Sequence, residues 1–276
     1  MGFKNARFGR IDAHIATCAF SRQILRNAVA LAESKGFKLV HGIVDSMWLK
    51  KTNATQAEYE DLCREIEVQL HFPIGFEGVY KWIVFLNSHT NPHIPVLNRY
   101  YGALQGVGLK LRGIDIRKHD TPAIVRRCQS DMLALFAHAA NSEAVMALIP
   151  EALNIVRSYA NLIRDGAVPI KELTIEKRLS KNLNEYRNMV PQAIAAQHLS
   201  REGRIVHAGQ TLSYIVAYNR SRIAQNRALP TELVDENCPV DSEGYVDLLL
   251  ASTANLLLPF GYNAAALRRW IKRTTG

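Results

Sequence analysis

Apolar residues in the first part of the chain recur at helical spacing. Over residues 11–34 they repeat every three or four positions, which predicts one long helix that ends before Gly36. Thr55 with Glu58 three residues later is a capping-box pattern, and it predicts a second amphipathic helix over residues 55–70. These two helices frame a short segment of different character.

That segment, residues 40–49, places Asp45 between two short apolar or β-branched runs. The pattern predicts two strands that meet in a tight turn at Asp45. Further strand-like segments follow at 76–86, 98–104 and 109–116, with a glycine-containing hairpin turn over 105–108. The first part of the chain is therefore predicted to mix helices with an antiparallel sheet.

The pattern changes near residue 118, and from there helical spacing dominates. Helices are predicted over 124–139, 142–165, 189–201 and 246–272, the last with a break at 259–261. One strand is predicted over 209–217. The fold class predicted from the residues is α+β, with a mixed first half followed by a mainly helical second half.

Composition and charge narrow the class of protein. Of the 276 residues 48% are hydrophobic and 21% charged, which favours a folded chain over a disordered one. The net charge of +9 favours a polyanionic partner, nucleic acid first and an anionic membrane surface second. The four cysteines form no CxxC pair, so neither a zinc site nor a disulfide framework is predicted. The longest apolar stretch, residues 248–260, is too short to cross a bilayer and predicts a buried helix.

Asp45 is the first candidate for chemistry. A carboxylate in an otherwise apolar hairpin is costly to bury unless it is paired or binds a cation. A divalent metal is one explanation, and a solvated turn aspartate is the other. The residues of the hairpin alone leave both explanations open.

Three segments taken in order point to a family. They are residues 42–46 (GIVDS), residues 97–100 (LNRY), and residues 112–120 (RGIDIRKHD). In this order the chain resembles the C-terminal part of archaeal-type family B DNA polymerases, which carry YxDTDS, KKRY and RGxExxRRD before a helical thumb. Residues 2–9 resemble the segment that follows the family's fingers motif. The resemblance implies a palm part over residues 1–118 and a thumb over residues 119–276.

The resemblance assigns roles to two acidic residues. Asp45 corresponds to the second aspartate of YxDTDS, which binds the catalytic divalent metals. Glu77 lies in a segment similar to the family's EGFYK, close to the catalytic carboxylates. Mg²⁺ is the implied cofactor, because it accepts carboxylate and phosphate oxygens in two-metal nucleotidyl transfer.

The resemblance also implies a surface for primer-template DNA, with deoxynucleoside triphosphates as substrates. Phosphate contacts of this kind give salt-sensitive affinity without reading sequence. The implied DNA-binding residues are Asn98, Arg99, Tyr100, Arg112, Arg117, Lys118, Lys177, Arg178, Lys181 and Arg187. A prokaryotic cytoplasm, at the nucleoid and not at a membrane, is the implied location.

The chain departs from the family pattern at several positions. Ile43 and Val44 replace the first aspartate and the threonine of YxDTDS, and Leu97 and Asn98 replace the two lysines of KKRY. No DxxSLYPS segment is present, so the second metal-binding carboxylate and the fingers are missing. We therefore expect a larger polymerase subunit, or the missing part of a longer protein, to complete the site.

Two other functions remain open. The chain is a non-catalytic DNA-binding clamp or scaffold if Asp45 binds no metal, or a basic domain for an anionic membrane or metabolite if duplex DNA does not bind. Substitution of Asp45 separates the first of these from a polymerase.

Overall fold

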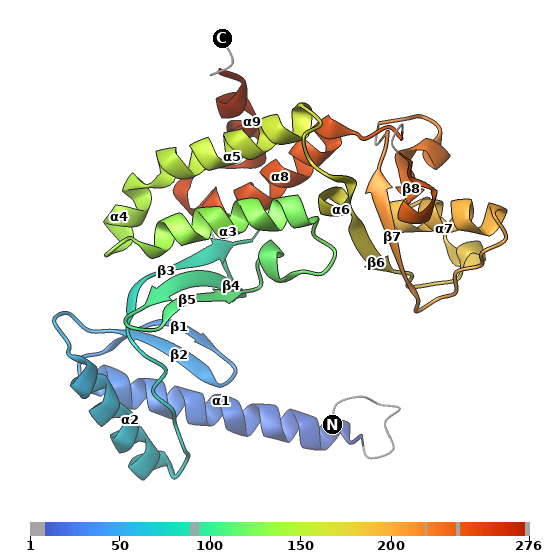
Figure 1. Ribbon diagram of the computed structural model, residues 1–276. Coiled ribbons are helices and arrows are strands. Elements are labelled where there is room, and N and C mark those ends of the chain that lie inside the picture. Colours follow the sequence, from blue (N-terminus) through green and yellow to red (C-terminus); the bar gives the residue numbers. More distant parts are fainter. Residues whose placement is uncertain (1–8, 89–90, 92–93, 219, 236–237, 274–276) are drawn as a thin grey trace. The chain divides into compact units, whose positions relative to one another are not determined.

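The computed structural model describes residues 9–88, 91, 94–218, 220–235 and 238–273 (Figure 1). The resemblance predicted for residues 2–8 lies outside these ranges. The chain forms two compact units, one with the residues up to Tyr80 and residues 104–106, the other with the remaining residues. This division differs from the predicted palm and thumb, which stay a prediction about function.

The first unit contains two helices and one hairpin. Its elements are α1 (Ile11–Ser34), β1 (Lys38–Ile43), β2 (Ser46–Lys50) and α2 (Gln56–Leu70). The C-terminal half of α1 packs on α2 and buries a small core made of Ala28, Ala32, Phe37, Leu62 and Ile66. Both predicted helices and the predicted hairpin are confirmed.

The start of α2 was predictable from sequence because its cap is formed by two residues only three positions apart. The backbone N–H of Glu58 donates to the Thr55 hydroxyl, and the Glu58 carboxylate accepts from the Thr55 backbone N–H at 2.8 Å. The predicted capping box is therefore present. Such caps satisfy backbone donors that a helix leaves unpaired at its first turn.

The N-terminal half of α1 has a different environment. Residues 11–20 are all exposed, including the large apolar side chains of Ile15 (61%) and Phe20 (72%). Only Ala28 and Ala32 of this helix are buried. Within the described residues, the first three turns of α1 therefore have apolar side chains without a core to pack into.

The second unit begins with a three-stranded sheet in the order β3-β4-β5. Its strands are β3 (Tyr80–Asn87), β4 (Pro95–Leu104) and β5 (Gly108–Arg112). The helices that follow are η1 (Asp115–Arg117), α3 (Ala123–Ala137), α4 (Ser142–Ala147), α5 (Ile149–Arg164) and α6 (Ile170–Leu173).

The rest of this unit joins a second small sheet to the C-terminal helices. The elements are β6 (Ile175–Arg178), η2 (Leu183–Glu185), α7 (Pro191–Arg201), β7 (Thr211–Val216), η3 (Ala224–Arg227), β8 (Ala228–Pro230), η4 (Thr231–Leu233), α8 (Ser242–Leu257), η5 (Leu258–Phe260) and α9 (Ala264–Arg273). The sheet is antiparallel with the order β6-β7-β8.

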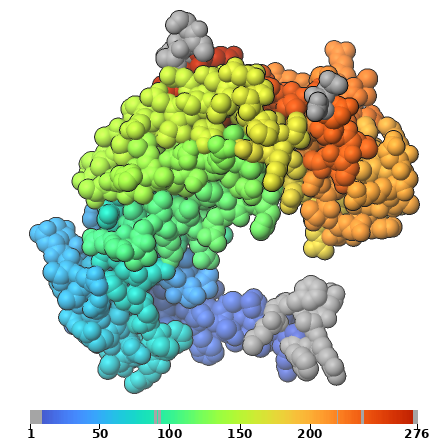
Figure 2. All heavy atoms as spheres, viewed as in Figure 1, coloured from blue at the N-terminus to red at the C-terminus, as the bar shows by residue number. Residues whose placement is uncertain are grey.

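The core of the second unit lies where α3, α5 and α8 pack together (Figure 1). Two buried tyrosines tie other elements to α8: Tyr101 on β4 donates to the Leu256 carbonyl at 3.0 Å, and Tyr245 donates to the Leu173 carbonyl at 2.8 Å. In the space-filling view, side chains close the gaps between α3, α4 and α5 (Figure 2). Both tyrosines are fully buried members of this core, and their hydroxyls are satisfied by backbone carbonyls.

Some predicted boundaries are wrong for identifiable reasons. The predicted helix 142–165 is two helices, because the chain re-enters a helix at Ile149 with Pro150 in its first turn, where proline is tolerated. The predicted strand 109–116 stops at Arg112, because Gly113 has a φ of +64° and turns the chain into η1. The strand predicted from residue 76 begins at Tyr80.

The second half contains more strand than its helical spacing predicted. Residues 209–217 do form β7, but β6 and the three-residue β8 were not predicted. The helical C-terminal region is confirmed, with its break at η5 and Gly261, which has a φ of +87°. No helix among the described residues is long and apolar enough to span a membrane. The predicted α+β class is confirmed.

Candidate functional site

Asp45 lies at the tip of the β1–β2 hairpin. Ile43 pairs with Ser46, so Val44 and Asp45 form the two-residue turn. Val44 adopts a φ of +47°, which is strained for a β-branched side chain. The Asp45 side chain is exposed, and Oδ1 accepts a hydrogen bond from the Ser46 hydroxyl at 3.2 Å. The hairpin therefore presents one carboxylate outward, with its second oxygen unengaged by other described residues.

Two aromatic rings contact each other across the strands that lead to the turn. His41 is buried, and its ring lies 5.1 Å from the ring of Trp48 on the neighbouring strand. The β1–β2 register contains one irregularity between Leu39 and His41. The packing fixes the hairpin that carries Asp45.

Glu77 lies in the segment that precedes β3 and is exposed. Asp45 and Glu77 both belong to the first unit. Within the described ranges, no group of three or more His, Cys, Asp and Glu side chains is close enough to hold a metal ion. The residues present therefore supply individual carboxylates but not a complete Mg²⁺ site, and a metal would need ligands from outside this set.

The predicted DNA-binding residues all belong to the second unit. On β4, Asn98 is exposed, and Arg99 is half-buried with its Nε donating to the Gly113 carbonyl at 3.0 Å. Tyr100 is only 2% exposed and its ring lies 5.8 Å from that of Phe85. The burial of Tyr100 favours a packing role over the predicted contact with a primer strand.

Residues 112–118, here named the basic turn, connect β5 to the segment before α3. Arg112, Arg117 and Lys118 are exposed. The Nζ of Lys118 lies 2.6 Å from Oδ1 of Asp115, whereas Arg112 and Arg117 have no side-chain partner in the part of the chain that the structure describes. The structure thus brings three of the predicted residues together and leaves two of their charges uncompensated.

The other four predicted basic residues lie on β6 and the loop after it. Lys177 forms an ion pair with Asp120 at 3.2 Å, and Arg178 donates from Nε to the Gly209 carbonyl at 2.6 Å. Lys181 and Arg187 are exposed on either side of η2. The pair Lys177–Asp120 connects β6 with the segment that follows the basic turn.

Asp115 belongs to the RGIDIRKHD segment, but no role of its own was predicted for it from sequence. It is 7% exposed, and Asn255 on α8 donates to its Oδ2 at 2.8 Å. Burial alone would raise the pKa of Asp115, but hydrogen bonds from Lys118 and Asn255 and the charge of Lys118 outweigh burial and hold this pKa below its ordinary value. Asp115 is therefore the buried carboxylate of the basic turn, and its pKa is held low by the groups that contact it.

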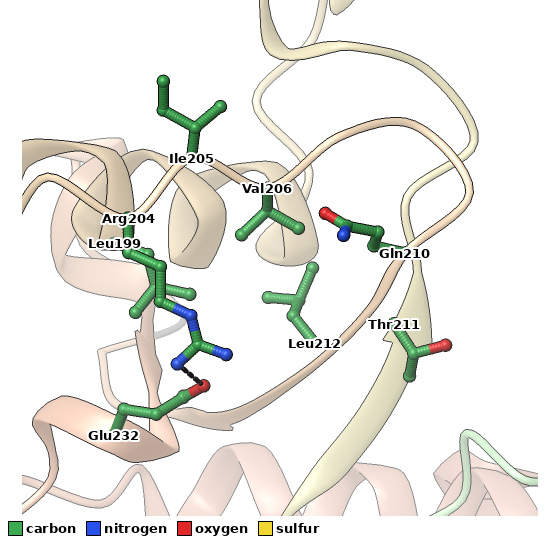
Figure 3. A pocket seen from close by; sticks show the side chains of 8 residues that line it. All are labelled: Leu199, Arg204, Ile205, Val206, Gln210, Thr211, Leu212 and Glu232. Carbon is green, nitrogen blue, oxygen red and sulfur yellow. Dashed lines mark hydrogen bonds and ion pairs between the residues drawn. The ribbon is translucent and has the colours of Figure 1, made fainter.

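A cavity of about 350 Å³ lies beside α7 and β7 (Figure 3). Leu199, Val206 and Leu212 form its apolar floor, and an ion pair of 2.8 Å between Arg204 and Glu232 lies at its edge (Figure 3). Neither Asp45, Glu77 nor any of the ten DNA-binding residues named from the resemblance lines it. The cavity is therefore separate from the candidate site.

Comparison with known proteins gives matches that run through most of the chain. The model of DNA polymerase family B matches residues 10–260. The chain is 25% identical to a DNA polymerase of Archaeoglobus fulgidus over 97% of this chain and 34% of that protein, and 24% identical to DNA polymerase 3 of Saccharolobus solfataricus over 96% and 32%. It thus spans about a third of the length of these relatives.

The fold of the chain is also similar to that of a solved protein. The structure of the family B DNA polymerase from the hyperthermophilic archaeon Pyrobaculum calidifontis is similar with a TM-score of 0.65 at 22% identity, over 92% of this chain and 31% of that one. The family match covers most of the chain, including the Asp45 hairpin, the basic turn and α8. This chain therefore belongs to DNA polymerase family B.

Proposed function

We propose that this chain is the palm-and-thumb portion of a DNA-directed DNA polymerase, with the palm over residues 1–118 and the thumb over residues 119–276. It adds nucleotides to a primer 3′-hydroxyl only when the remainder of the polymerase is present. The observation that carries the proposal is Asp45 at the tip of a two-residue turn inside the family match. The threefold greater length of the relatives supports the need for a further portion.

The proposed role of Asp45 is to supply one carboxylate ligand to Mg²⁺. Its exposure and its unengaged oxygen suit that role, because Mg²⁺ in such sites takes one or two carboxylates together with waters and phosphate oxygens. Glu77 is proposed to lie close to the catalytic carboxylates without binding the metal itself. Another ligand must come from the remainder of the polymerase, and we derive no catalytic step from this chain's carboxylates alone.

The proposed role of the second unit is to hold the DNA backbone. Arg112 and Arg117 offer uncompensated charge, and Lys118, Lys177, Arg178, Lys181 and Arg187 extend the basic surface. Such contacts suit an enzyme that copies any template, because phosphate recognition carries no sequence information.

The exposed start of α1 supports a partner for the first unit. An amphipathic helix gains most of its stability from packing its apolar face, yet Ile15 and Phe20 are 61% and 72% exposed in the described chain. The remainder of the polymerase is the proposed occupant of this face.

A second function, a DNA-binding scaffold without catalysis, is favoured by one observation. Ile43 and Val44 replace an acidic and a hydroxyl residue beside Asp45, and Val44 is strained where the family carries threonine. A protein that had lost catalysis but still bound DNA would keep its basic surface and lose acidic residues of the active site.

One experiment separates the two functions. The chain is isolated with the polymerase portion that assembles with it, and primer extension is measured with Asp45→Asn. Glu67→Gln serves as the control, because Glu67 is an exposed acid in the same unit and its loss changes the charge equally. Extension lost only in Asp45→Asn supports the polymerase. If extension survives in Asp45→Asn, the proposed metal role of Asp45 is wrong. If the unsubstituted chain shows no salt-dependent binding to duplex DNA, both proposed functions are wrong.

A further inference from the structure

Asp115 has no part in the function proposed above, although its burial is costly. A buried carboxylate is tolerated only when its oxygens are paired or hydrogen-bonded. Both oxygens of Asp115 are engaged: Oδ1 with Lys118 three residues later, and Oδ2 with Asn255, which is 140 residues away in sequence. The carboxylate therefore links the basic turn to α8.

The same turn is anchored a second time through its backbone. The N–H of Ile116 donates to Oε1 of Gln129 on α3 at 2.8 Å. The amide of Gln129 in turn donates to the carbonyl and the hydroxyl of Ser252 on α8, at 3.0 and 2.7 Å. With Ile114 fully buried, three consecutive residues of the basic turn are fixed by α3 and α8.

The orientation of the Asn255 side chain satisfies only one of its two polar atoms. Its Nδ2 donates to Asp115, while its Oδ1 is buried without a hydrogen-bond partner among the described residues. A buried oxygen without a hydrogen-bond partner is unfavourable. The orientation is kept because the Asp115 carboxylate can only accept hydrogen bonds, so the Nδ2 donor of Asn255 must face it.

The exposed cations of the turn depend on this anchoring. The backbone N–H of Arg117 donates to the Ile114 carbonyl at 3.2 Å, and that of Lys118 to the Asp115 carbonyl at 2.9 Å. The direction in which Arg117 leaves the surface is therefore set by residues whose own positions are fixed from beneath.

We infer that Asp115 and Asn255 are positioning residues that hold Arg117 in place for a phosphate of the DNA backbone. This inference rests on the proposed DNA contact of the basic turn. The link between Asp115 and α8 makes a thumb helix part of the support for a phosphate-binding turn.

Asn255→Ala is the first test, because it removes the anchor and leaves every charge in place. Binding of a mixed-sequence DNA duplex is measured over a series of salt concentrations. We expect weaker binding and a logarithmic salt dependence shallower by about 0.9, the value for one lost phosphate contact. Thr253→Val is the control, because Thr253 is buried on the same helix and its hydroxyl has no hydrogen-bond partner among the described residues.

Asp115→Asn is the second test, and here the two explanations predict opposite changes in DNA affinity. Removal of a negative charge beside Arg117 predicts tighter DNA binding if only the net charge matters, whereas loss of position predicts weaker binding with the shallower salt dependence. Thermal unfolding of each variant confirms that binding is measured on folded protein, since the salt dependence of folded protein is not altered by stability alone.

The outcomes are distinct. If the unsubstituted chain shows no salt-dependent duplex binding, the proposed function fails. If it binds, and both Asn255→Ala and Asp115→Asn bind as the Thr253→Val control does or more tightly, the positioning role is overturned while the proposed function remains.

Discussion

Arg99 and Gly113 are joined by a hydrogen bond: the Nε of Arg99 donates to the carbonyl oxygen of Gly113 at 3.0 Å. Gly113 has a φ of +64°, and a Cβ there would lie 2.6 Å from the Asn98 carbonyl oxygen and 2.8 Å from Cγ of Arg99. A glycine is thus required twice, for its backbone conformation and for the space beside Arg99. This contact fixes where β5 ends and the basic turn begins.

The first prediction separates those two requirements. Gly113→Ala should lower the free energy of unfolding by about 1–3 kcal/mol more than Gly166→Ala, because overpacking adds to the backbone cost. Gly166 is the matched control, with a φ of +67° and no atom within 4 Å of the added Cβ. Urea denaturation of both variants measures the difference. Equal losses would mean that the structure relaxes around Arg99 without cost.

The second prediction concerns the pH dependence that Asp115 contributes. Its folded pKa lies below the ordinary value of 3.8, so the unfolded state binds a proton first as the pH falls. The stabilisation is therefore complete well above pH 3.8 and is lost as the pH falls through the folded pKa. Asp115→Asn should lower the free energy of unfolding by about 1–3 kcal/mol at pH 7.

The same difference should shrink below pH 3.8. Denaturation of the unsubstituted chain and of Asp115→Asn at both pH values measures it. A difference that stays constant from pH 7 into the acid range would show that Asp115 is not ionised in the folded chain.

The third prediction ranks two neighbouring cations. Arg117→Ala should weaken duplex binding and reduce the salt dependence by about 0.9, whereas Lys118→Ala should have a smaller effect, because Asp115 at 2.6 Å already offsets the charge of Lys118. Fluorescence anisotropy with a labelled duplex measures both. Arg222→Ala is the control, since Arg222 is an exposed arginine outside the predicted DNA surface. Equal losses for Arg117 and Lys118 would contradict the ranking.

The fourth prediction tests the exposed face of α1. Ile15→Glu should change the stability of the chain by no more than about 0.5 kcal/mol, because Ile15 is 61% exposed. The same change should reduce the share of the chain that elutes with the remainder of the polymerase in size-exclusion chromatography. Ala28→Glu provides the contrast, because Ala28 is buried and its substitution should unfold the first unit. Unaltered assembly of Ile15→Glu would place the interface elsewhere.

Local pattern was sufficient for the elements whose stability is local. The repeat of apolar residues located α1, and the reciprocal hydrogen bonds of Thr55 and Glu58 located the start of α2. The hairpin at Asp45 followed from two apolar runs around a two-residue turn. In each case, the interacting groups lie within a few positions of one another, so their spacing in the sequence is the structural signal.

Local pattern failed where an element depends on distant partners. The three-residue β8 exists because Tyr214, Ile215 and Val216 of β7 pair with it, and no periodicity can be recognised over so short a strand. The single helix predicted over residues 142–165 is divided because Pro150 suits only the first turn of a helix.

The sequence by itself determined the α+β class, the Asp45 hairpin and the family resemblance, because these depend on order and spacing along the chain. Only the tertiary structure decided that Tyr100 is buried, that Asp115 meets Asn255, and that Lys118 is paired while Arg117 has no ion-pair partner among the residues described. The physical reason is that burial and pairing arise from contacts between residues far apart in sequence, for which the chain carries no local pattern.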